Sequence, residues 1–167
     1  IGPSNNQSSN YSFEKNKYVE VENLKGFAIF FNVEKFQRAF FDENFFLFFE
    51  EIDLCKSVKL RKGKILICKD IIINHEGESS VKKDKEFELE KNRNWHWMWS
   101  TFYYHKKYKG YFLALLIISP KLISSFLKTI FYQLIFSNQK RDIYFSRMSG
   151  IMNSIIGKKS WYRPSLD

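Results

Sequence analysis

The chain has 167 residues, a formal net charge of +9 at pH 7, and a composition that is 44% hydrophobic and 27% charged. This length and balance fit one ordinary globular domain and exclude wholesale disorder, while three prolines and seven glycines exclude collagen-like and linker classes. Aromatic residues make up 19% of the chain, so we expect some to face a membrane, a sugar or a partner instead of a core.

The basic charge belongs to the second half of the chain. Residues 1–90 contain 14 Lys and Arg against 16 Asp and Glu, whereas residues 91–167 contain 13 against 2. The resulting charge of +11 in residues 91–167 predicts an anionic surface, either nucleic acid or lipid headgroups, near that half. Cys55 and Cys68 lie in apolar or mixed segments, which favours buried, reduced thiols in a cytosolic chain.

In chain order, the first half alternates short apolar runs with helical patterns. Three such runs predict strands that join one sheet edge, at 26–31, 64–68 and 71–75. The spacing of apolar residues predicts a two-turn helix over 33–40 and a longer helix over 50–62, which Gly63 ends. Residues 1–90 are therefore expected to form an α/β unit.

After a charged loop over residues 76–90 the pattern becomes nearly all helical. We expect helices near 93–108, 120–136 and 139–156, packed beside the sheet. The first places Trp95, Met98, Trp99 and Phe102 on one stripe. Ser119-Pro120 predicts the start of the second, because Ser caps helices and Pro suits their first position. Residues 91–167 thus form a basic, aromatic helical region.

The apolar stretch over residues 111–136 raises the question of a membrane span. A span needs about 20 mostly apolar residues. Here no more than 11 uncharged residues separate neighbours among Lys109, Lys121, Lys128 and Lys140. A hairpin lying on a bilayer, with lysines at headgroup level, fits better than a span, and a soluble, buried helix pair is the alternative.

The densest acidic cluster is Glu50-Glu51-Ile52-Asp53, at the start of a predicted helix. Acidic residues are common in a first helical turn because they complement the helix dipole, and this alone is one explanation. The preceding residues 44–49 are largely aromatic, however, and carboxylates held against apolar surface become better bases. His75 follows a predicted strand, where it is either a hydrogen-bonded structural residue or a metal ligand.

These motifs, in this order, resemble the acceptor half of family-two inverting glycosyltransferases, most closely the rhamnosyltransferase-type enzymes of bacterial surface polysaccharide synthesis. The resemblance rests on the apolar run 26–31, the acidic-aromatic block 41–55, and a His 24 residues after Glu51 that is followed by Gly77 and Ser79. The basic tail, at 147–150 and 157–164, is similar to the C-terminal helices of the same family.

The resemblance implies a fold, a reaction and roles. The fold is the C-terminal half of a GT-A-like nucleotide-sugar transferase, followed by a helical, membrane-proximal region. Glu51 would be the base that deprotonates the acceptor hydroxyl, Asp53 and Glu50 would orient the acceptor or the loop, and His75 would help hold a divalent metal, Mg or Mn. One of Glu50 and Asp53 should also meet a backbone amide or a basic partner. Glu51 should open into a cleft shared with His75.

The implied partners are a nucleotide-sugar donor, a glycan or lipid-linked acceptor and an anionic membrane surface, which places the chain in the cytoplasm at the inner face of the cell membrane. The family's donor-binding half and its Asp-x-Asp motif do not occur in this sequence, so the metal is expected only together with that half. We therefore expect either a fragment or a truncated product.

Two alternatives to an active transferase remain. The first is a catalytically inactive, membrane-associated remnant of one. The second is a basic module that binds nucleic acid by stacking bases on the Trp and Tyr side chains between residues 93 and 109. No nucleic-acid-binding motif supports this second alternative, so nucleic acid is not an expected partner.

Overall fold

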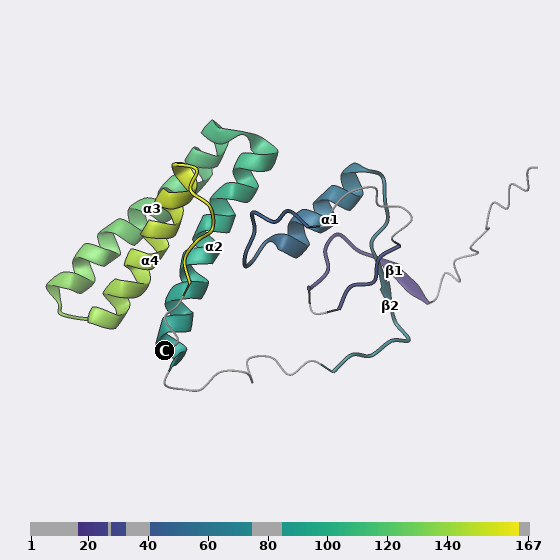
Figure 1. Ribbon diagram of the computed structural model, residues 1–167, viewed down its shortest axis with the longest axis horizontal. Coiled ribbons are helices and arrows are strands. Elements are labelled where there is room, and N and C mark those ends of the chain that lie inside the picture. Colours follow the sequence, from purple (N-terminus) through teal and green to yellow (C-terminus); the bar gives the residue numbers. More distant parts are fainter. Residues whose placement is uncertain (1–16, 27, 33–40, 75–84, 164–167) are drawn as a thin grey trace, which may run out of the picture.

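The computed structural model describes residues 17–26, 28–32, 41–74 and 85–163. Within these ranges the order is β1 (Tyr18–Glu20), α1 (Glu50–Leu60), β2 (Leu66–Cys68), α2 (Glu86–Lys109), α3 (Tyr111–Leu134) and α4 (Asn138–Ile155). Figure 1 shows α2, α3 and α4 as one group of long helices, with α1 and the small sheet on the other side of α2.

The predicted α/β, GT-A-like fold is wrong. The described residues contain a single two-stranded antiparallel sheet, in which Tyr18 pairs with Cys68 and Glu20 with Leu66, and the rest is mostly helix. Of the expected strands, only 64–68 contains one. Residues 28–31 and 71–74 form no strand, and Ile72 is 86% exposed. An apolar run becomes a strand only where a neighbouring strand and a core receive it, and among the described residues neither is found beside 71–74.

The predicted helices agree better with the structure. The helix expected over 50–62 is α1, those near 93–108 and 139–156 are α2 and α4, and the one over 33–40 lies outside the described residues. The predicted start at Pro120 is wrong, because α3 begins at Tyr111 and contains Pro120 in its interior. Pro120 cannot donate to the carbonyl of Leu116, but the Ser119 hydroxyl donates to that oxygen at 3.0 Å instead.

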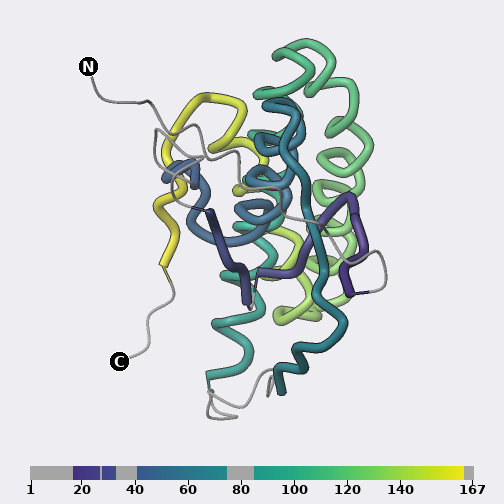
Figure 2. The backbone as a smooth tube through the Cα atoms, turned by 90° about the vertical axis from the view of Figure 1, so that its right-hand side faces the viewer, coloured from purple at the N-terminus to yellow at the C-terminus, as the bar shows by residue number. Residues whose placement is uncertain are grey.

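The core lies among α2, α3 and α4, which pack along one another in both views (Figures 1 and 2). Its fully buried members come from all three helices and are Met98, Phe102, Ala114, Ile118 and Ile151. The predicted stripe on α2 is confirmed, since Trp95, Met98, Trp99 and Phe102 are all at most 3% exposed. Periodicity along α2 thus found the face that the other two helices cover.

Two glycines allow the helices to approach and reverse. Gly110, between α2 and α3, has φ of 84°, a backbone conformation that residues with a side chain rarely adopt. At Gly150 of α4, a Cβ atom would lie 2.3 Å from the carbonyl oxygen of Trp95 in α2. The backbones of α2 and α4 are therefore in direct contact at this point.

The segment after α4 returns across α2. The Trp99 indole donates to the carbonyl of Lys158 at 3.0 Å. His96, which is fully buried, lies 2.8 Å from both the Tyr162 carbonyl and the Ser160 hydroxyl. Since the carbonyl can only accept, Nε2 of His96 carries a proton, and because burial lowers the pKa of His96, Nδ1 is unprotonated at neutral pH and accepts from Ser160. Neutral His96 thus anchors the C-terminal segment.

Candidate functional site

Residues 41–49 fix where α1 begins. Asp42 accepts hydrogen bonds from the backbone N–H and side chain of Asn44 at 3.0 and 2.7 Å, which forms a tight turn. Phe48 and Phe49 then adopt left-handed backbone conformations, with φ of 66° and 70°. Such conformations are costly for bulky residues and persist where the surroundings hold them. Here both rings pack against Trp97 of α2.

This loop delivers the three acids that the sequence singled out. Glu50, Glu51 and Asp53 are the first, second and fourth residues of α1, directly after the aromatic residues. Phe49, directly before them, also contacts Tyr104 of α2 at 5.3 Å between ring centroids. The start of α1 is thus held against the flank of α2.

Asp53 is the anchor between α1 and α2. Its side chain is only 4% exposed, and its carboxylate accepts from the Lys107 ammonium and the Tyr108 hydroxyl, each at 2.8 Å. Lys107 also reaches Asp42 at 2.8 Å, and Tyr103 donates to Asp42 at 3.1 Å. The expectation that Glu50 or Asp53 meets a basic partner is therefore met by Asp53.

The pKa values in this network follow from burial and from the shared ammonium. Burial alone would raise the pKa of Asp42, but hydrogen bonds from Lys107 and Asn44 hold it below its ordinary value. Burial likewise opposes the charge on Lys107, and its two carboxylate partners still raise its pKa. Burial and the hydrogen bond to Asp53 raise the pKa of Tyr108. Asp42 and Lys107 therefore both stay charged at neutral pH.

Glu50 and Glu51 differ from Asp53 in having unused carboxylate oxygens. One oxygen of each is buried and has no hydrogen-bond partner among the described residues. Burial, with a further contribution from the charge on Glu51, raises the pKa of Glu50. Glu50 and Glu51 thus each keep a carboxylate oxygen free of described hydrogen bonds, whereas the Asp53 carboxylate is engaged by Lys107 and Tyr108.

Glu51 lies beside an apolar cavity. A Cβ atom placed on Gly26 would lie 3.7 Å from the Cβ atom of Glu51, so the Glu51 side chain runs along the backbone of Gly26. Leu54 and Cys55 follow one turn later on the same face of α1. Both line an open, largely apolar cavity of about 330 Å³, whose other lining residues include Leu24, Phe30, Phe31 and Ile65. Glu51 itself does not line this cavity, but it stands on α1 one turn before two residues that do.

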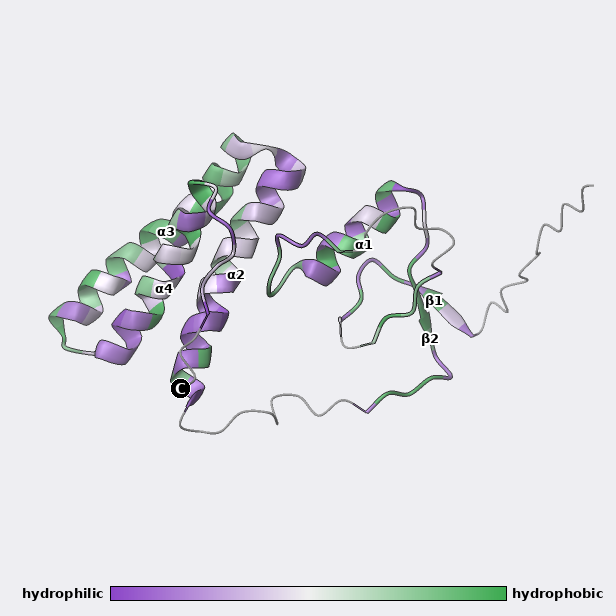
Figure 3. Cartoon of the chain, in the orientation of Figure 1, coloured by the Kyte–Doolittle hydropathy of each residue, from purple (hydrophilic) through white to green (hydrophobic). Residues whose placement is uncertain are grey.

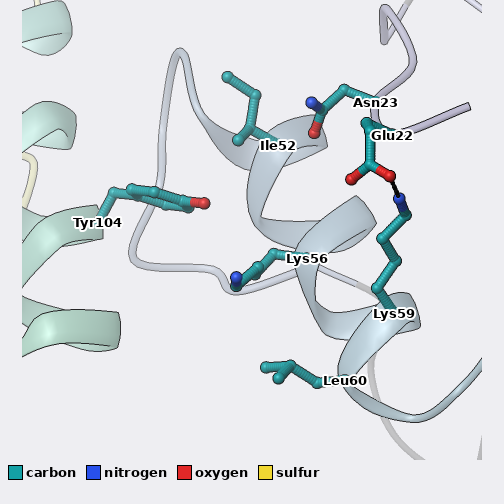
Figure 4. Close-up of a pocket in the computed structure, with 7 residues that line it drawn as sticks. All are labelled: Glu22, Asn23, Ile52, Lys56, Lys59, Leu60 and Tyr104. Carbon is teal, nitrogen blue, oxygen red and sulfur yellow. Dashed lines mark ion pairs between the residues drawn. The ribbon is translucent and has the colours of Figure 1, made fainter.

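A second cavity, of about 340 Å³, lies on the neighbouring face of α1 (Figure 4). Figure 4 shows Ile52 and Lys56 on α1, with Tyr104 of α2 opposite and Glu22 paired to Lys59 at the rim. The predicted acids do not line this cavity. Charged side chains of both signs line this cavity, and its lysines were not among the functional residues predicted from the sequence.

The predicted metal ligand cannot be placed, because His75 lies outside the described residues. The cleft that Glu51 was expected to share with His75 is equally untested. Within the described part of the chain, no three His, Cys, Asp or Glu side chains come together as a group that could hold a metal ion. The described residues alone therefore do not fit a divalent metal, and no step below depends on one.

The tryptophan side chains of α2 pack against other residues of the protein. Trp95 and Trp99 are 1% and 3% exposed, and Trp99 stacks on Tyr103 at 5.0 Å. Trp97 is 42% exposed, yet it packs against Phe48 and Phe49. These rings are consequently poor platforms for stacking bases.

Sequence reasoning missed Asp42, Lys107 and Tyr108. Asp42 occurs within the acidic-aromatic block, but the bridging Lys107 follows Asp53 by 54 residues. No local spacing connects them. The only available signal was the position of Lys107 in the last turn of a helix, where basic residues are common for other reasons.

Comparison of the chain with protein-family models, curated proteins and solved structures yields no match. The resemblance to family-two glycosyltransferases therefore rests on the motifs alone and stays a prediction.

Proposed function

We propose that this chain carries the acceptor side of a sugar-transfer site, in which Glu51 is the general base. The observation that carries the proposal is that the three acids differ in their hydrogen-bond partners. Asp53 is committed to Lys107 and Tyr108, whereas Glu51 keeps a buried oxygen with no described partner and stands one turn before Leu54 and Cys55, which line an apolar cavity. The motifs quoted above supply the reaction class.

In this reaction the carboxylate of Glu51 removes the proton of an acceptor hydroxyl. The hydroxyl oxygen attacks the anomeric carbon of the donor sugar while the bond from that carbon to the nucleotide diphosphate breaks, which inverts the configuration. The nucleotide diphosphate leaves with the electron pair. The cavity beside Glu51 would receive the acceptor sugar against Phe30 and Phe31.

Glu50 is the competing base, and the helix geometry separates the two. Consecutive helical residues point about 100° apart, so Glu50 and Glu51 cannot both face one hydroxyl. Glu51 stands three and four residues before Leu54 and Cys55, which both line the apolar cavity, whereas Glu50 shares its face with Leu54 but not with Cys55. We therefore assign the base to Glu51 and leave Glu50 to raise the negative potential around it.

Saccharide binding tests the acceptor half of the proposal with the chain as it is. A panel of mono- and disaccharides would be titrated into labelled protein and followed by NMR. We expect shifts confined to residues around the cavity, such as Gly26, Phe30 and Cys55. Glu51→Gln should retain binding, because it preserves the shape of the site. A panel in which no saccharide perturbs these residues contradicts the proposal.

Transfer tests the role of Glu51, with the chain joined to a nucleotide-binding half. Removing a general base costs about two to four orders of magnitude in rate, so Glu51→Gln should nearly abolish transfer while donor binding persists. Glu43→Gln is the matched control, since Glu43 is exposed just before the same helix. If Asp53→Asn is inactive while Glu51→Gln transfers sugar, Asp53 is the base. Saccharide binding without transfer from any nucleotide sugar favours the inactive remnant.

A further inference from the structure

The outer face of α3 is a continuous apolar surface that the rest of the described chain leaves uncovered. Figure 3 shows α3 as the most hydrophobic of the long helices. Its large side chains are exposed at Phe112 (81%), Leu116 (69%), Leu127 (58%) and Leu134 (71%). Soluble monomers rarely expose contiguous apolar patches beyond a few hundred Å², so this face calls for an occupant.

Helix periodicity places these residues on one side. Ala114, Ile118 and Ser125 are buried against α2 and α4 and mark the inner face. Residues three or four positions apart share a face, and the exposed apolar positions recur at that spacing on the opposite side. We define this outer face by its members, which are Phe112, Leu113, Leu116, Ile123, Leu127, Ile130, Phe131 and Leu134.

Basic residues lie along one flank and at both ends of the outer face, and two of them, Lys128 and Lys140, sit over the rings of Tyr144 and Tyr132. Lys121 and Lys128, seven residues apart, lie along one flank of α3, while Lys109 precedes it and Lys140 follows it. From residue 91 to residue 163 the one acidic side chain is Asp142, and it is paired with Arg141. A second copy of the chain would bring the same positive charge against this surface, whereas anionic headgroups complement it.

The packing of α3 decides between lying on a bilayer and crossing it. By length and composition alone α3 is long and apolar enough to span a membrane. However, α4 runs beside it along its length, from the stacked rings of Tyr132 and Tyr144 to the Tyr111 hydroxyl, which donates to the Ile155 carbonyl at 3.4 Å. A spanning α3 would carry Arg141 and Arg147 of α4 into the hydrocarbon.

We propose that the outer face of α3 docks onto the surface of an anionic bilayer, with the helix axis parallel to the membrane and α2 and α4 on the side away from the lipid. The apolar side chains of the outer face enter the acyl boundary, and the surrounding lysines reach the headgroups. The proposal goes beyond sugar transfer and does not rest on it, because it requires no saccharide and no acid of α1.

Flotation of the full chain with lipid vesicles tests the docking. At low salt the protein should float with vesicles of equal parts phosphatidylcholine and phosphatidylglycerol, and bind far less to phosphatidylcholine alone. Leu116→Gln/Ile123→Gln/Leu127→Gln should weaken binding about 100-fold, since three apolar side chains no longer insert. Lys121→Gln/Lys128→Gln should weaken it about thirtyfold. Gln favours helix, so both variants should retain the wild-type circular dichroism.

The matched control removes equally exposed apolar side chains away from α3. Leu60, Ile71 and Ile72 are 65%, 56% and 86% exposed, and their replacement by Gln should leave flotation unchanged. The proposal is overturned if the wild type stays at the bottom with anionic vesicles. It is overturned as well if the triple variant of α3 binds anionic vesicles as tightly as the Leu60, Ile71 and Ile72 control. It is also overturned by retention on vesicles after alkaline carbonate, which indicates a span, or by a dimer that only the α3 variant dissociates.

Discussion

Replacing Lys107 by Met removes the ammonium group that α2 places between Asp42 and Asp53. The Lys107 nitrogen lies 2.8 Å from a carboxylate oxygen of each acid, and the exposed fractions of the three side chains are 32% for Lys107, 16% for Asp42 and 4% for Asp53. In the variant, Asp53 keeps the Tyr108 hydroxyl but loses its countercharge. A nearly buried carboxylate is then left without compensation.

The expected cost follows from that burial. Breaking a fully buried ion pair costs about 3–5 kcal/mol, and an exposed pair contributes about 0–1 kcal/mol. Because Lys107 itself is about one-third exposed, we place the loss in unfolding free energy between these limits, at about 2–3 kcal/mol. Met retains most of the apolar stem, but it also loses the contacts of the ammonium with the Phe45 and Tyr108 rings, whose centroids lie 5.8 and 5.6 Å from the Lys107 nitrogen.

Urea unfolding followed by tryptophan fluorescence measures this loss. Lys109→Met is the matched control, because it removes the same charge from the last turn of α2 at an exposed position and should cost less than about 0.5 kcal/mol. In a double-mutant cycle, Lys107→Met and Asp53→Asn should couple by at least about 1 kcal/mol. Equal costs for the two lysines, or no coupling, would refute the anchor.

Three further predictions concern pH and packing. The pKa of Asp42 is held below its ordinary value of 3.8, so its contribution to stability is present above pH 3.8 and is lost as the pH falls through the folded-state pKa. The unfolding free energy of the wild type should therefore fall more steeply with acid than that of Asp42→Asn. Burial lowers the pKa of His96 below 6.5, despite its bond to the Tyr162 carbonyl, so the neutral form stabilises the fold above that pH. Below it, Trp161 fluorescence should report release of the C-terminal segment, and His96→Gln should remove this pH dependence. Gly150→Ala should lower stability by about 1–3 kcal/mol although Ala favours helix, because its Cβ would meet the Trp95 carbonyl; a rise in melting temperature would contradict the close approach of α2 and α4.

The sequence alone determined the features that depend on neighbours along the chain. Apolar spacing located α1 and α4 closely, and it identified the buried stripe of α2 from Trp95 to Phe102. The same local rules predicted strands at 26–31 and 71–75, whose described residues form none, and a helix start at Pro120, which was wrong. Strand formation needs a partner that a β-branched run does not specify, and Ser119 supplies the donor that Pro120 lacks.

Only the tertiary structure decided which acid is engaged and which is available. Glu50, Glu51 and Asp53 look alike in sequence, since all three stand in one first turn after aromatic residues. Lys107, 54 residues beyond Asp53, selects Asp53 and leaves an oxygen of Glu51 without a described partner. Pairing across that separation depends on the docking of α1 against α2. Hydrophobic periodicity fixes the inward face of each helix, but it carries no information on which residue of another element meets it.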